Sequence, residues 1–175
     1  MNSVLECPGA RFDGDCLIVP KKTADETLEA PFPLRYPQLA GLVTHWKNFV
    51  VSAGVVAGDV VACVVPNRLE FVVSFFSIVG ARAIIAPLNP AFKKEELLYY
   101  LRDLNAKAVI VSTGQPAAES AAADLHLSLW HIDIDPNHVL PEQAPTPELS
   151  RIRPLPGDIA LMLHTSGTTG RPKGP

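Results

Sequence analysis

Apolar residues recur at steps of three and four between Pro37 and Gly54. This spacing predicts a helix with one apolar face, because an α-helix completes a turn every 3.6 residues. After a turn at Gly58 and Asp59, the chain is continuously apolar and rich in valine from Val60 to Val65. A run this short, ended by Pro66, predicts a strand buried on both faces.

A second unit of the same kind follows. Asn67 is a good N-cap, and Glu70 three positions later completes a capping-box pattern. The predicted helix is apolar nearly all round and ends at Gly80, so we expect it to be deeply buried. A second buried strand is expected at 83–86, where Pro87 ends it.

The alternation continues along the chain. Further helices are expected at 93–105 and 116–125, and further strands at 108–111, 130–134 and 158–163, the last of them buried. Strands that alternate with helices predict βαβ units. The fold class is therefore α/β, a mostly parallel sheet flanked by helices on both faces.

The two flanking stretches lack this order. Residues 1–34 have no sustained period and are interrupted by prolines, so we expect a loop-rich N-terminal segment with at most one short strand. Six prolines between Asp135 and Pro156 predict a surface connector, since neither a helix nor a central strand tolerates that density. We therefore divide the chain into a segment 1–34 and a folded part 35–175.

Composition narrows the function classes. Of the 175 residues, 47% are hydrophobic and 19% are charged, and the net charge is −3. These values exclude a disordered acidic tail and a basic nucleic-acid-binding arm, so we expect no nucleic-acid partner. No apolar run reaches the roughly 20 residues of a membrane span, and residues 1–10 do not resemble a secretory signal. Three cysteines without a Cys-x-x-Cys pair predict reduced thiols in an intracellular protein.

The segment that points to chemistry is 165–174, directly after the last predicted strand. Three glycines allow a tight turn and bring backbone N–H groups close to a ligand. Four hydroxyl side chains can donate to phosphate oxygens or face a metal ion, and Lys173 adds a compact positive charge. A loop at the carboxyl end of a parallel strand is also where α/β sheets bind ligands. The segment therefore predicts a phosphate-binding loop.

Two other interpretations of the loop fit the sequence less well. A flexible linker seldom follows a buried strand or ends in Pro-Lys-Gly. A Walker A loop needs Gly, four residues, then Gly-Lys and a hydroxyl residue, whereas Pro172 stands five places after Gly167 and Gly174 follows the lysine. The Walker pattern is therefore absent.

With its flanking motifs, the loop resembles the phosphate-loop signature of the adenylate-forming (AMP-binding) enzymes, which include acyl-CoA synthetases and luciferases. Further motifs occur in the order typical of that family, so the resemblance spans about 36–174. They are Gly58-Asp59-Val60-Val61-Ala62, Pro66-Asn67 with Glu70-Phe71, and Pro87-Leu88-Asn89-Pro90 with Glu95-Glu96-Leu97. The sequences at 163–166 and 89–94 resemble more narrowly the oxalate–CoA ligase, or peroxisomal CoA-synthetase-like, subgroup.

The resemblance implies a fold, an activity and a set of binding residues. The folded part would be the first subdomain of the N-terminal domain of an enzyme that joins a small carboxylic acid to ATP and then to CoA. The residues that would line the ATP phosphates are Thr165, Ser166, Gly167, Thr168, Thr169, Gly170 and Lys173. Thr165 would also lie next to Mg²⁺. No catalytic base is expected, because the acid itself attacks the α-phosphorus.

The resemblance also implies that several family parts are not in these 175 residues, among them the C-terminal domain with the lysine that completes adenylation. We therefore expect the chain alone to be inactive and the remainder of the enzyme to be a partner. Two alternatives stay open: a catalytically dead interaction module, and a self-contained nucleotide-binding domain. The compartment would be the cytoplasm or the peroxisome, although the sequence carries no targeting signal. The five histidines show no metal-ligand spacing, so surface or core imidazoles are expected; for His164 alone, directly before the loop, contact with the nucleotide or acid site stays open as the alternative.

Overall fold

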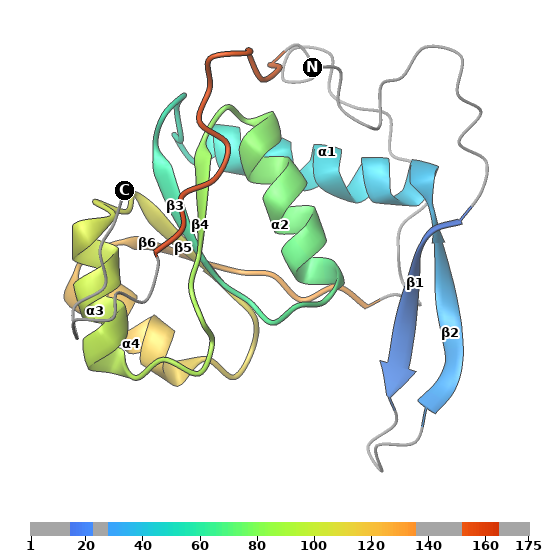
Figure 1. Ribbon diagram of the computed structural model, residues 1–175, viewed down its shortest axis with the longest axis horizontal. Helices are drawn as coiled ribbons and strands as arrows, with labels where there is room; N and C mark the ends of the chain where they lie inside the picture. Colours follow the sequence, from blue (N-terminus) through green and yellow to red (C-terminus); the bar gives the residue numbers. More distant parts are fainter. Residues whose placement is uncertain (1–14, 23–27, 136–151, 165–175) are drawn as a thin grey trace.

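The computed structural model describes residues 15–22, 28–135 and 152–164. Its centre is a four-stranded parallel sheet in the order β4-β3-β5-β6 (Figure 1). The strands and helices of this body are β3 (Val60–Val64), α2 (Leu69–Gly80), β4 (Ile84–Pro87), α3 (Lys94–Asp103), β5 (Ala108–Val111), α4 (Pro116–Asp124) and β6 (Ser128–His131). Helix α1 (Tyr36–Ser52) precedes them. The expected α/β class with a parallel sheet is confirmed.

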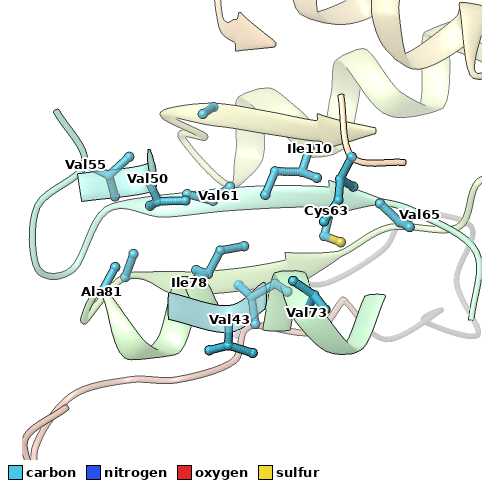
Figure 2. Packing of buried hydrophobic residues seen from close by; sticks show 14 of the residues in the cluster. Val43, Val50, Val55, Val61, Cys63, Val65, Val73, Ile78, Ala81 and Ile110 are labelled. Carbon is cyan, nitrogen blue, oxygen red and sulfur yellow. The ribbon is translucent and has the colours of Figure 1, made fainter. Parts of the chain in front are cut away.

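Alternate residues of the central strand supply two separate cores. Val61 and Cys63 of β3 lie in one core with residues of α1 and α2, while Ala62 and Val64 lie in the other with residues of α3 and α4. This division follows from strand geometry, because successive side chains point to opposite faces of a sheet. Figure 2 shows Val61, Cys63 and Ile110 in the first core with side chains from the two helices that cover it. The helices therefore lie on both faces, as the sequence predicted.

Burial of Cys63 makes its thiol inert. The side chain is 1% exposed, and burial raises its pKa to about 12, against a usual value of 9.0. The neutral form therefore dominates at any physiological pH. Cys63 is a free cysteine, and the other two cysteines of the prediction, Cys7 and Cys16, lie outside the described side chains.

The region before α1 differs from its expected form. It contains two strands, β1 (Asp15–Lys22) and β2 (Leu28–Arg35), paired antiparallel beside the start of α1 (Figure 1). The expectation of at most one short strand before residue 35 was therefore wrong. Prolines were the misleading signal: both strands of a two-stranded ribbon are edges, where a residue without an N–H is tolerated.

The predicted start of α2 also needs correction. Its N-cap is Arg68, not Asn67, and no side chain caps it. Glu70 does not complete a capping box; its Oε1 instead accepts a hydrogen bond from the backbone N–H of Ile134, at 3.2 Å. The carboxylate thus ties the helix to the chain that follows β6, a distant partner that local spacing does not reveal.

The two-sided core predicts how the chain responds to truncation. We expect Ile85→Ala to lower the free energy of unfolding by about 2–5 kcal/mol, because Ile85 is fully buried in the first core. The matched control is Ile159→Ala, which removes the same atoms from a side chain that is 60% exposed. Urea unfolding followed by circular dichroism measures both, and equal losses would contradict the described packing.

Candidate phosphate-binding edge

All seven residues predicted to bind the nucleotide phosphates lie outside the described residues, and so does the whole 165–174 loop. What the structure describes is the approach to the loop, residues 152–164, here called the return segment. The position of this segment against the sheet, and the side chains that hold it there, are the observations that bear on the site.

The return segment runs parallel to β4 and extends the sheet on that side. Leu161 forms a parallel bridge with Ile85. The N–H of Ile85 donates to the carbonyl of Ala160 at 3.1 Å, and the N–H of Met162 donates to the carbonyl of Ile85 at 3.0 Å. All strands of the sheet share one direction, and the return segment runs the same way. His164, the last residue of the segment, therefore lies at the carboxyl edge of the sheet. The chain therefore enters residue 165 at the edge where parallel sheets bind ligands.

The segment is not the buried strand that the sequence predicted. Ile159, Leu161 and Leu163 are 60%, 40% and 54% exposed. They alternate along the chain, so they project from the same face of the extended segment. That face is exposed, and within the described part of the chain β4 is the strand that pairs with the segment. The apolar run was therefore interpreted correctly as extended, and wrongly as buried.

An ion pair fixes the beginning of the return segment. The guanidinium of Arg82 donates twice to the carboxylate of Asp158, from Nε at 2.8 Å and from Nη2 at 2.9 Å. The N–H of Leu155 donates to the same carboxylate at 2.8 Å. Arg82 adopts a φ of 65°, in the left-handed region that residues with a side chain seldom enter. Its carbonyl accepts a hydrogen bond from Gly58, so the turn before β4 is tied to the turn before β3.

This pair controls the charge of Asp158. The hydrogen bonds from Arg82, followed by that from Leu155, lower the pKa of Asp158 to about 2. The pKa of Arg82 is raised by the same contact. Both groups are thus charged across the range in which proteins are normally studied.

A second side-chain pair fixes the other end of the segment. The Nε2 of His164 lies 2.9 Å from Oδ2 of Asp103 at the end of α3, and the imidazole meets the Tyr100 ring edge-on, with centroids 4.9 Å apart. Tyr100 is stacked in turn on Phe92. The His164 side chain is only 6% exposed. The last described residue before the predicted loop is therefore firmly held.

Polar contacts also occupy the carboxyl ends of β5 and β6. Asp133 accepts hydrogen bonds from the N–H of Thr113 at 3.0 Å and from its hydroxyl at 2.5 Å. These bonds lower the pKa of Asp133. They connect the turn after β5 to the chain after β6 and so stabilise this edge of the sheet. No group of three potential metal ligands occurs among the described residues, and Thr165, the expected neighbour of Mg²⁺, lies outside them.

A comparison with protein-family models matches residues 21–174 to the AMP-binding enzymes. The chain belongs to the AMP-binding enzyme family. The match covers the sheet, the return segment and the loop sequence, and it confirms the resemblance that the sequence motifs indicated.

Curated relatives point to CoA ligases within the AMP-binding family. The chain is 37% identical over 151 residues to a probable CoA ligase of Humulus lupulus, covering 82% of this chain and 29% of that protein. It is also 37% identical over 167 residues to an oxalate–CoA ligase of Arabidopsis thaliana, covering 89% of this chain and 32% of that protein. The chain thus spans about a third of the length of these relatives.

Solved structures agree with the fold. ATP-bound MatB of Rhodopseudomonas palustris matches with a TM-score of 0.65 and 26% identity, over 89% of this chain and 31% of that one. An acyl-CoA synthetase of Brucella canis matches with the same TM-score and identity, over 94% of this chain and 31% of that one. These neighbours support the parallel sheet with helices on both faces as the architecture of this family.

Sequence reasoning missed Asp103 and Arg82, the partners of the return segment. Each lies more than sixty positions from the residue that it binds. Their only local signals are weak ones: Arg82 stands between two alanines in a turn, and Asp103 ends a helix. No motif links either residue to 158–164, so the fold itself was needed to bring them together.

The Arg82–Asp158 pair predicts an acid-dependent loss of stability. Because the pKa of Asp158 is lower in the folded chain, the pair contributes stability above the usual carboxyl pKa of 3.8, and this contribution disappears as the pH falls towards about 2. Asp158→Asn should therefore be less stable than the wild type at pH 6, and the difference should vanish near pH 2. Urea midpoints measured against pH test this, and a difference that is independent of pH would contradict it.

Proposed function

We propose that the chain is the N-terminal, phosphate-binding part of an AMP-forming acid–CoA ligase. The observation that supports the proposal is the parallel alignment of the return segment with β4, which brings His164, the residue before the Gly- and Thr-rich sequence, to the carboxyl edge of the sheet. The family match, which extends to residue 174, supports the same function for the loop. Neither observation depends on the loop's own conformation.

The proposed reaction has two steps. A carboxylate oxygen of the acid attacks the α-phosphorus of ATP, an acyl-adenylate forms, and pyrophosphate leaves. The sulfur of CoA then attacks the acyl carbon, a thioester forms, and AMP leaves. Both leaving groups are polyanions, so the protein's task is to orient the phosphates and offset their charge.

The loop residues suit that task. The backbone N–H groups around Gly167 and Gly170 can approach phosphate oxygens closely, and the hydroxyls of Thr168 and Thr169 can donate to them. The ammonium group of Lys173 would balance charge on the leaving pyrophosphate. ATP would enter as its Mg²⁺ complex, with Thr165 next to the metal ion. Ser166 would complete the cradle.

The acid substrate is proposed to be small, with oxalate as the first candidate. The Arabidopsis relative is an oxalate–CoA ligase, and a second oxalate–CoA ligase, from Saccharomyces cerevisiae, is 29% identical over 195 residues. In our proposal the protein is located in the cytoplasm or the peroxisome. None of the described helices is long and apolar enough to cross a bilayer.

The remainder of the enzyme is the proposed macromolecular partner. The relatives are about three times as long as the part that this chain covers. Among the described residues the return segment pairs with β4 along one edge, so its other edge offers backbone groups to a further strand, and its three exposed aliphatic side chains offer an apolar face. We therefore assign the acid pocket, the adenine contacts and most CoA contacts to residues that this sequence does not include.

The loop assignment predicts a weak, lysine-dependent response to nucleotide. Mg·ATP added to the full 175-residue chain should shift the amide resonances of 165–174 in fast exchange. Lys173→Gln should reduce these shifts about tenfold below saturation, the effect of one charge-assisted hydrogen bond. Lys107→Gln is the matched control, because Lys107 is exposed and far along the chain from the loop. No shift in the wild type would favour a dead interaction module, and tight binding would favour a self-contained nucleotide domain.

The division of labour between the chain and the remainder predicts no turnover by the chain alone. ATP–pyrophosphate exchange should stay at background with oxalate, malonate, acetate and longer acids, since the groups that complete adenylation are assigned elsewhere. Exchange above background with any of these acids would show that 175 residues suffice. The assay needs a complete adenylate-forming enzyme as its positive control.

A further inference from the structure

The return segment lies at the outer edge of the sheet. It pairs with β4, and β4 is the end of the strand order β4-β3-β5-β6 on that side (Figure 1). Ile85 of β4 binds the carbonyl of Ala160 and the N–H of Met162, the two residues that flank Leu161. In a parallel ladder this pattern directs the backbone groups of the flanked residue away from the neighbouring strand. The N–H and C=O of Leu161 therefore point outwards.

Two further residues share the orientation of Leu161. Ile159 and Leu163 lie two positions before and after it, and the backbone groups of an extended chain alternate with a period of two. Within residues 15–22, 28–135 and 152–164, no hydrogen bond uses the N–H or C=O of these three residues. Their side chains are 60%, 40% and 54% exposed, and residues 159–163 include neither a charge nor a proline, the usual features that prevent pairing at an edge. This edge is thus able to accept another strand.

We propose that this edge pairs with the same edge of a second copy of the chain, in antiparallel register about a two-fold axis at Leu161. Leu161 then lies opposite Leu161 of the second copy, and Ile159 lies opposite Leu163. All three outward-pointing residues can form hydrogen-bonded pairs, in which opposite residues exchange both N–H···O bonds. Aliphatic side chains meet at every pair. Because both copies use the same stretch, association stops at a dimer.

Charges at the two ends of the return segment favour the antiparallel direction. Arg82 binds Asp158 at the beginning, with its side chain 32% exposed, and Asp103 binds His164 at the end, with its side chain 43% exposed. Residues 158 and 164 are each three positions from Leu161, so the register places the beginning of one segment beside the end of the other. Arg82 of one copy then approaches Asp103 of the second copy. Parallel pairing would instead bring like charges together.

The shortness of the edge makes the proposed dimer weak. A standard interface has about 20–30 residues on each side, whereas this one has a single short strand. We therefore expect a dissociation constant of about 0.1–1 mM. The dimer does not depend on the function proposed above. The same edge was assigned there to strands of the remainder of the enzyme, so the remainder and a second copy would compete for it.

The first test is the self-association of the full 175-residue chain. Sedimentation velocity should show a monomer at about 10 µM and a dimer fraction that rises towards about 1 mM. In this range the amide resonances of Ile159, Leu161 and Leu163 should shift, whereas that of Met162, already bonded to β4, should change less. A chain that remains monomeric at the highest concentration, or a dimer whose shifts lie elsewhere, would overturn the proposal.

The second test places like charges at the two-fold axis. Leu161→Lys should weaken the dimer about tenfold, because it removes an aliphatic contact and sets two ammonium groups opposite each other. Phe49→Lys is the matched control: Phe49 is also 40% exposed, but it contacts Trp130 of β6, at the opposite edge of the sheet. Circular dichroism checks that both variants fold. Equal weakening by the two substitutions would contradict the proposed interface.

The third test determines the register by mixing variants, so it does not depend on the stability of any one of them. Ile159→Lys and Leu163→Glu should each weaken the dimer, and their mixture should restore it, because the antiparallel register sets the introduced ammonium opposite the introduced carboxylate. A mixture of Ile159→Lys and Ile159→Glu is the control and should stay weak. Recovery in the control mixture would indicate parallel pairing, and recovery in neither mixture would exclude this edge as the interface. Both results would overturn the proposal.

Discussion

The rest of the structure depends on the burial of short parallel strands on both faces. Strands β3, β4 and β5 have only four or five residues each, and nearly all of these residues are buried. Such strands cannot be stable alone, so two helices must cover each face. Once α1 and α2 cover one side and α3 and α4 the other, the direction of every strand is fixed. All polar turns that follow the strands then gather at one edge.

The sequence predicted this layered body well, because its signals are local. The spacing of Leu39, Val43 and Val50 defines a helical face, and the valine run at β3 cannot alternate with polar residues if both faces are buried. Turn residues and prolines bounded each element within a few positions. The same locality explains the errors. A proline count cannot distinguish a loop from a two-stranded ribbon, and an apolar run does not reveal whether a neighbouring strand covers it.

The site was predictable to a different extent. The composition of the 165–174 loop indicated phosphate binding because glycine, hydroxyl and lysine are needed there in one short stretch. The contacts that hold the approach to the loop are made over long distances in sequence, by Arg82 at one end and Asp103 at the other. Each contact joins side chains that meet only after the chain has folded, and no periodicity in the sequence indicates such a contact. The residues proposed to bind a ligand are thus easier to single out from sequence than the residues that hold the return segment.

The unusual backbone of Arg82 reflects a compromise between two demands at one position. Glycine would enter the left-handed region freely, yet it has no guanidinium to grip Asp158. A residue with a negative φ would not reproduce the turn that leads into β4. Arginine at this turn adopts an unfavourable backbone conformation, and its side chain in return binds Asp158 of the return segment, which lies 76 positions later in the chain. We therefore expect natural substitutions at Arg82 and Asp158 to occur together, and seldom at one of the two residues alone.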